Sequence, residues 1–368
     1  MVSEEKSRIQ TPLGKVLWTM VATILTLVKL PFWLLYFIPS WLRPHPERTY
    51  LQAIFQPLLK TFVYHSTLVK LQMPVSLEPE VEKERFVTID PRENGIFRGI
   101  LTDTDIQPTV VPGSWFPTPY RPKSGAEDQI IVLYLHGGAF VLRSAISEFP
   151  AKTLATNLKT SVLSISYRLS CNPNCEFPAA LQDAVSAYHY LLSLAIPASQ
   201  IIVAGDSAGA NLVIGLLRYI AENPDKLPHP RAAILSSPWV DLVSAINPDN
   251  LDKHRKASTD YLPGNFTAWG AREYVPSRMD AASPYISPLT HPFHTETPLW
   301  ICVGGLEIFC DAGIRFAENM KAKGNRVMVH VEPFASHSIV GLGNLTGFTR
   351  EAGIAVKLAG EWIRETES

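Results

Sequence analysis

The chain has 368 residues, of which 46% are hydrophobic and 18% charged, a composition typical of a globular protein. Its formal net charge of −1 gives no long-range attraction for a polyanion, which argues against nucleic-acid binding. The cysteines form no Cys-x-x-Cys pair and the histidines lack zinc-ligand spacing, so we expect no metal site. The sequence leaves open whether Cys171 and Cys175 form a disulfide.

A long apolar segment lies near the N-terminus. Residues 16–38 contain one charged residue, Lys29, and one proline, Pro31. At about 1.5 Å per residue, a helix of this length can cross the roughly 30 Å hydrocarbon core of a bilayer. We therefore expect residues 1–15 to be an N-terminal tail and residues 16–38 to be a single membrane span or anchor. The expected location is an endomembrane, and the sequence does not determine on which side of it the catalytic domain lies. The alternative is a buried helical hairpin broken near Pro31.

The rest of the chain divides into a segment without regular hydrophobic periodicity and a segment in which strand-like and helical patterns alternate. Residues 39–106 show no strong period, and 107–116 fit a short edge strand. Strand-like runs follow at 129–135, 161–167, 200–204, 231–236, 298–303 and 326–332, and helical patterns at 178–194, 208–222, 311–323 and 350–365. This alternation predicts an α/β fold with a mostly parallel sheet and helices on both faces.

One connection in the regular region is too long for an ordinary crossover between neighbouring strands. Residues 241–297 are rich in proline, aspartate and serine. Long connections of this kind are commonly functional. We expect this segment to form a lid or cap over the active face.

A candidate nucleophile lies in Gly205-Asp206-Ser207-Ala208-Gly209, which fits the pattern G-x-S-x-G. A serine at such a strand-to-helix turn has its hydroxyl lifted out of the sheet. Earlier in the chain, His136-Gly137-Gly138 follows the first strand of the alternating region, and its glycines allow backbone N–H groups to approach a substrate. We expect Ser207 to be the nucleophile and His136 to hold its loop. The expected oxyanion hole consists of the N–H groups of Gly137, Gly138 and Ala208.

A serine nucleophile needs a histidine base and an acid, which in this architecture follow the serine in the order acid, then histidine. His337 lies in the loop after the last strand, whereas His330 lies within the strand pattern. Glu307 comes just past the strand at 298–303, whereas Asp311 starts the next helix, where an N-cap role explains it. We expect His337 to be the base and Glu307 the acid.

As a set, these motifs resemble the hormone-sensitive-lipase-like branch of the α/β-hydrolases, and the segments at 167–169, 177–183 and 237–239 agree. The resemblance runs from about residue 107 to the C-terminus and is nearest to fungal membrane-anchored members. The family acid is usually aspartate, whereas this chain has Glu307. The resemblance implies a catalytic domain at 107–368 and a cap built from part of 39–106 and from about 242–290. We also expect Phe140 and Trp239 to contact the substrate.

These features favour a serine hydrolase that cleaves a carboxylic ester of a lipophilic small molecule through an acyl-enzyme, without a cofactor. The resemblance implies tailoring hydrolases of secondary metabolism and sterol-ester deacetylases as relatives. Acyl transfer to another acceptor, or lactone opening, would use the same residues. A catalytically inactive ligand receptor is disfavoured because serine, acid and histidine are all present. Glycosylation at Asn265 or Asn344 is expected only if the domain is lumenal.

Overall fold

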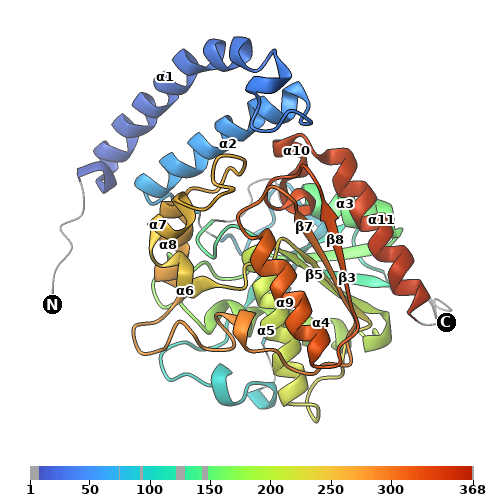
Figure 1. Ribbon diagram of the computed structural model, residues 1–368. Coiled ribbons are helices and arrows are strands. Elements are labelled where there is room, and N and C mark those ends of the chain that lie inside the picture. Colours follow the sequence, from blue (N-terminus) through green and yellow to red (C-terminus); the bar gives the residue numbers. More distant parts are fainter. Residues whose placement is uncertain (1–7, 74, 92–93, 122–128, 143–147, 367–368) are drawn as a thin grey trace.

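The computed structural model describes residues 8–73, 75–91, 94–121, 129–142 and 148–366, and within them one eight-stranded sheet forms the centre of the molecule (Figure 1). Its strands, in chain order, are β1 (Phe86–Ile89), β2 (Val111–Phe116), β3 (Ile131–Leu135), β4 (Ser161–Ile165), β5 (Ile201–Asp206), β6 (Ala232–Ser236), β7 (Leu299–Gly304) and β8 (Val327–Glu332). Their spatial order is β1-β2-β4-β3-β5-β6-β7-β8. All pairs from β4 to β8 are parallel, as the alternation predicted.

The expectation of an edge strand at 107–116 is wrong in its position. The strand exists as β2, but it pairs antiparallel with β4 on one side and with β1 on the other. The edge is therefore β1, which has only four residues in a charged stretch and gives no recognisable period in the sequence.

The helices within the described residues are α1 (Pro12–Tyr36), α2 (Tyr50–Leu68), α3 (Glu148–Leu158), α4 (Ala179–Ser193), α5 (Ala208–Glu222), α6 (Leu242–Ala245), α7 (Pro248–Asp252), α8 (Gly264–Tyr274), α9 (Cys310–Ala322), α10 (Ile339–Thr346) and α11 (Thr349–Glu365). Side chains of α4, α5 and α9 pack on one face of the sheet, and those of α3, α10 and α11 on the other. In β3, Leu133 and Leu135 join the first core while Val132 and Tyr134 join the second. Burial on both faces explains why these strands read as continuous apolar runs.

The N-terminal apolar segment is one continuous helix, α1, which extends through Pro31. It is long and apolar enough to cross a membrane by length and composition, and Ala22 is its buried residue. The helix runs back along α2: Lys15 Nζ lies 3.3 Å from the carbonyl of Lys70, and Tyr50 Oη donates to the carbonyl of Leu34 at 2.6 Å. The break near Pro31 that the buried-hairpin alternative required is absent from α1, and most of the helix is exposed.

Two separate parts of the chain lie over the carboxyl ends of the strands. The first is α2, which begins with a capping box between Thr49 and Gln52. The second is the segment between β6 and β7, which carries α6, α7 and α8. Residues of α2 and α8 contact each other, so the two parts form a joint cover on the side of the sheet where the loops after β3, β5, β7 and β8 end (Figure 1).

Candidate active site

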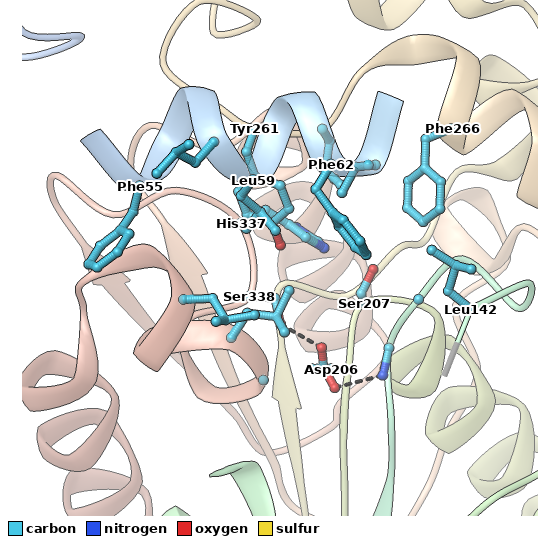
Figure 2. Close-up of a pocket in the computed structure, with 18 of the residues that line it drawn as sticks. Phe55, Leu59, Phe62, Leu142, Asp206, Ser207, Tyr261, Phe266, His337 and Ser338 are labelled. Atoms are coloured by element: carbon cyan, nitrogen blue, oxygen red, sulfur yellow. Dashed lines mark hydrogen bonds between the residues drawn. The ribbon is translucent and has the colours of Figure 1, made fainter. Parts of the chain in front are cut away.

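Ser207 lies in a strained turn between β5 and α5. Its backbone has φ 53° and ψ −118°, a conformation that non-glycine residues rarely adopt. The turn brings the start of α5 close to β3, and only glycine fits at position 209: a Cβ there would lie 2.1 Å from the carbonyl oxygen of Leu135. The sharp turn points the Ser207 hydroxyl into a cavity beneath α2 (Figure 2).

The neighbour of the serine, Asp206, connects three loops of the site. Its buried carboxylate accepts hydrogen bonds from the Tyr134 hydroxyl, from the Ser338 hydroxyl and from the N–H of Gly137, the last at 2.8 Å (Figure 2). Aspartate at the variable position of G-x-S-x-G thus fixes the loop after β3 and the loop after β8 relative to the serine.

This arrangement contradicts the expectation that the Gly137 N–H belongs to an oxyanion hole, because that N–H already donates to Asp206. Gly138 follows with φ 111°, a left-handed conformation suited to glycine. Among the described residues, no hydrogen bond uses the N–H of Gly138, Ala139 or Ala208. The candidate donor pair therefore shifts by one residue, from Gly137 and Gly138 to Gly138 and Ala139, while Ala208 remains the third candidate.

His337 and Glu307 lie together at the ends of β8 and β7. His337 Nδ1 is 3.5 Å from Glu307 Oε2, an ion-pair distance that is long for a hydrogen bond, and both side chains are almost fully buried. Glu307 Oε2 also accepts from Ser237 Oγ at 2.6 Å. The other imidazole nitrogen, Nε2, has no hydrogen-bond partner among the described residues and lies at the cavity that Ser207 also lines (Figure 2).

Burial and charge act in opposite directions on this pair. Burial alone would lower the pKa of His337, but the carboxylates of Glu307, Asp260 and Asp206 together raise that pKa above its ordinary value. Burial raises the pKa of Glu307, and His337 and the Ser237 hydroxyl oppose that shift. The site therefore favours a positively charged imidazole, which is the state that a base reaches after it accepts a proton.

The structure adds a residue that sequence reasoning missed, Asp260, in the segment between β6 and β7. Its fully buried carboxylate accepts from the N–H of Tyr261 at 2.7 Å, of Ile308 at 2.8 Å and of His337 at 3.2 Å. The Asp260 side chain, which belongs to the cover, thereby fixes the backbone of Ile308, next to Glu307, and the backbone of His337. No local motif marks Asp260 in the sequence.

A second unforeseen link joins α2 to the same loops. The buried Arg48, just before α2, donates to the carbonyl of Phe334 at 2.9 Å and to the side-chain oxygen of Gln56. Gln56 in turn donates to the carbonyl of Ser258 at 2.8 Å, two residues before Asp260. The N-terminal part of the cover is therefore tied by polar contacts both to the His337 loop and to the Asp260 segment.

The cavity above Ser207 has a volume of about 520 Å³ and a mostly apolar lining. Figure 2 shows α2 above the cavity, with Phe62 directed toward Ser207. The lining comes from both parts of the cover and from the catalytic loops: Phe55, Leu58, Leu59, Phe62, Val63, Leu71, Met73, Tyr134, Gly137, Gly138, Leu142, Asp206, Ser207, Tyr261, Leu262, Phe266, His337, Ser338, Gly341, Leu342 and Leu345. Residues of α2 and of the segment between β6 and β7 therefore line the same cavity as the loops that carry Ser207 and His337.

Phe140 and Trp239, expected to contact the substrate, are absent from this lining and are almost fully buried. Phe140 stacks on Tyr274 with a ring separation of 3.7 Å and on Trp239 at 5.8 Å. The backbone N–H of Trp239 donates to the carbonyl of Ser207 at 3.2 Å. Their place in the fold corrects the expectation: both rings are packed in the core and do not line the cavity.

The residues set aside as alternatives lie away from Ser207. His136 is buried and stacks on Tyr167 at 4.2 Å, outside the cavity lining. His330 is in β8 with Nε2 3.6 Å from Glu332. Asp311 is in the first turn of α9, whose N-cap is Phe309, so the N-cap role expected for it is wrong; its carboxylate pairs instead with Arg255 and Lys256.

Other motifs carry no further chemistry in the part of the chain that is described. Cys171 and Cys175 are free thiols, and no group of three or more metal-ligating side chains occurs among the described residues. Asn265 lies in α8 and Asn344 in α10, each with a buried side-chain oxygen.

Comparison with known proteins agrees with this architecture. Residues 132–341 match a family model described as alpha/beta hydrolase fold. An esterase of Acinetobacter venetianus is 30% identical over 209 residues, which cover 56% of this chain and 66% of the relative. An acetyl-hydrolase of Streptomyces hygroscopicus is 34% identical over 186 residues, which cover 50% and 60%. The chain thus matches less than two thirds of the length of these relatives.

Solved structures extend the similarity to more of the chain. The crystal structure of an esterase from the bacterial hormone-sensitive lipase family has a TM-score of 0.60 and 26% identity, and covers 86% of this chain and 92% of its own. A hormone-sensitive-lipase homologue from a metagenome library has a TM-score of 0.61 and 27% identity, and covers 86% and 99%. The chain therefore belongs to the α/β-hydrolase family, in its hormone-sensitive-lipase-like branch.

Proposed function

We propose that this protein is a serine hydrolase that cleaves a carboxylic ester of a lipophilic small molecule. The observation that carries the proposal is that Ser207 and His337, from two separate loops, line one apolar cavity, while Glu307 from a third loop lies 3.5 Å from His337 Nδ1. The esterases and acetyl-hydrolase among its relatives support the reaction class. Reaction through an acyl-enzyme needs a nucleophile, a base and an orienting acid, and no cofactor.

In the proposed reaction, His337 Nε2 accepts the proton of Ser207 as Oγ attacks the ester carbonyl carbon. The developing oxyanion receives hydrogen bonds from the N–H groups of Gly138, Ala139 and Ala208. Glu307 stabilises the imidazolium, which then protonates the leaving alcohol. Water, deprotonated by His337, attacks the acyl-enzyme and releases the carboxylic acid and free Ser207.

The cavity supports an apolar substrate. Most of its lining residues carry aliphatic or aromatic side chains, and α2 supplies many of them. Sterol esters and apolar secondary-metabolite esters both belong to the class of substrate that such a chamber admits. We assign part of 39–106, including α2, and about 242–290 to the cap, and the remainder of 107–368, together with β1, to the catalytic domain. The lining from α2 and from residues 261–266 supports this division.

We place the protein at a membrane, with α1 as its attachment. Many large apolar side chains of α1 are exposed, and exposed apolar patches of this size mark interaction with a membrane or another protein. A lipophilic ester dissolved in the bilayer would then be concentrated next to the cavity.

The proposed reaction is tested with purified full-length protein and p-nitrophenyl butyrate. Ser207→Ala is expected to abolish hydrolysis, while Ser193→Ala on the exposed face of α4 keeps the wild-type rate. Wild-type activity in Ser207→Ala would refute the assignment of the nucleophile. Addition of a competing alcohol separates hydrolysis from acyl transfer by product analysis, and the absence of any turnover in the wild type would favour a receptor.

A further inference from the structure

A second hollow lies next to the catalytic cavity, between α1 and α2. It has a volume of about 380 Å³, and we call it the α1–α2 groove. It shares three lining residues with the catalytic cavity, namely Leu58, Phe62 and Leu71. These side chains form the partition between the two spaces, so the groove is separated from the chamber of Ser207 by single side chains.

Phe62 marks the point where the two spaces meet. Its ring is directed toward Ser207 from α2, yet 56% of the residue is exposed (Figure 2). A side chain that lines an enclosed chamber would be buried. The exposure of Phe62 therefore shows that the catalytic cavity opens beside it, on the side of the molecule where α1 lies.

The groove is suited to hydrocarbon although it contains several threonines. The hydroxyls of Thr19, Thr23, Thr26 and Thr61 each donate to a carbonyl of their own helix, at 2.7 to 2.8 Å. Their donors are therefore satisfied internally, and the methyl groups remain to contact a ligand. Ala22, the buried residue of α1, contributes to the same wall.

Two polar atoms in the groove lack partners. Trp18 Nε1 and His65 Nδ1 are buried without a hydrogen-bond partner among the described residues, and both side chains line the groove. Their rings meet edge to face at 5.7 Å. A buried polar group without a partner costs free energy, so a ligand that supplies a hydroxyl or carbonyl oxygen at this point would be favoured.

We propose that the α1–α2 groove is the membrane-facing arm of the substrate site. It takes the hydrocarbon part of a neutral, amphiphilic ester from the bilayer and lets the ester group pass Phe62 to reach Ser207. This inference rests on the proposed function, to which it adds an entry route and a substrate class: a long apolar body with a single oxygen within reach of Trp18 and His65. The exposed apolar side chains of α1 place the open side of the groove in contact with lipid.

The test uses the full-length protein on phosphatidylcholine vesicles with two substrates, p-nitrophenyl acetate and p-nitrophenyl laurate. Thr61→Trp fills the groove without touching the catalytic cavity. The ratio of laurate to acetate kcat/KM should fall by at least about tenfold, the loss expected when roughly two methylene groups can no longer be buried. Leu51→Trp, on an exposed part of α2 outside both spaces, should leave the ratio unchanged.

A second variant tests the polar end of the groove. Trp18→Phe keeps an aromatic ring and removes the N–H, so KM for the long-chain ester should rise by about fivefold, as for the loss of one hydrogen bond. Trp41→Phe, at a residue that is 76% exposed and outside the groove, should leave KM unchanged.

Labelling separates failure of the groove from failure of the proposed reaction. A diazirine-bearing fatty-acid ester should label the α2 peptide that lines the groove in the inactive Ser207→Ala variant, and Thr61→Trp in that background should abolish labelling of this peptide. Labelling elsewhere, together with an unchanged laurate-to-acetate ratio in Thr61→Trp, would overturn the groove inference. Absence of acetate hydrolysis in the wild type would instead refute the proposed function.

Discussion

The carboxylate of Asp260 accepts the backbone N–H of His337 at 3.2 Å. The same carboxylate holds the N–H of Ile308, the residue after Glu307, at 2.8 Å. A residue of the cover therefore positions the proposed base, His337, and the segment that carries the proposed acid, Glu307. Because its charge also contributes to raising the pKa of His337, Asp260 affects both the geometry and the protonation of the site.

Asp260→Asn should lower kcat by about 10- to 100-fold, because a misplaced base costs rate out of proportion to its displacement. It should also shift the acid limb of the pH profile of kcat/KM to lower pH, since one charge that raises the pKa of His337 is removed. Steady-state kinetics across pH measure both effects. If kcat falls but the pH profile does not move, Asp260 has only a structural role. The matched control is Asp252→Asn on α7, which should leave both kcat and the pH profile unchanged.

Glu307→Gln should reduce kcat by about 10⁴-fold, the loss seen when the orienting acid of such a triad becomes an amide. His337 acts as a base only when neutral, so activity falls as the pH drops through its pKa. Glu307 raises that pKa, and its replacement should move the acid limb of the residual activity to lower pH.

The control for this prediction is Asp311→Asn, which removes the other carboxylate that follows β7. It removes the charge that pairs with the exposed Arg255 and the buried Lys256, and it should keep wild-type kcat because Asp311 does not line the cavity of Ser207. If Asp311→Asn caused the large loss and Glu307→Gln did not, the acid would be Asp311.

Arg48→Met should destabilise the protein by about 1–3 kcal/mol, because it leaves the carbonyl of Phe334 and the side-chain oxygen of Gln56 without their buried donor. Burial lowers the pKa of Arg48 to about 10, and the residue remains charged at neutral pH. Urea unfolding measures the loss. Arg43→Met, which removes donors to backbone carbonyls in a less buried setting, should cost less. Equal stability of wild type and Arg48→Met would contradict the role of this contact.

Much of the catalytic geometry follows from the order of motifs along the chain. Strands β5, β7 and β8 are parallel, so the residues that follow them emerge at one edge of the sheet. Ser207 comes directly after β5, and Glu307 and His337 lie in the loops that follow β7 and β8, which explains why their proximity was predictable. The buried strands were predictable for the same reason, since continuous apolar runs are typical of a sheet covered on both faces.

The cover was less predictable, because its contacts are tertiary and polar. Asp260 has no local pattern, and its role exists only because the 241–297 segment folds back onto the loops after β7 and β8. The occupation of the Gly137 N–H was not predictable, because the carboxylate that accepts it, Asp206, lies 69 positions away in sequence. Phe140 and Trp239 were misplaced because an aromatic residue next to a motif can face either the cavity or the core.

Formation of an acyl-enzyme on Ser207 can be tested by intact-mass and peptide mass spectrometry after reaction with a fluorophosphonate. A single adduct is expected on the peptide that contains Ser207, with formation suppressed in His337→Ala and absent in Ser207→Ala. An adduct on another serine, or undiminished labelling of Ser207→Ala, would contradict it.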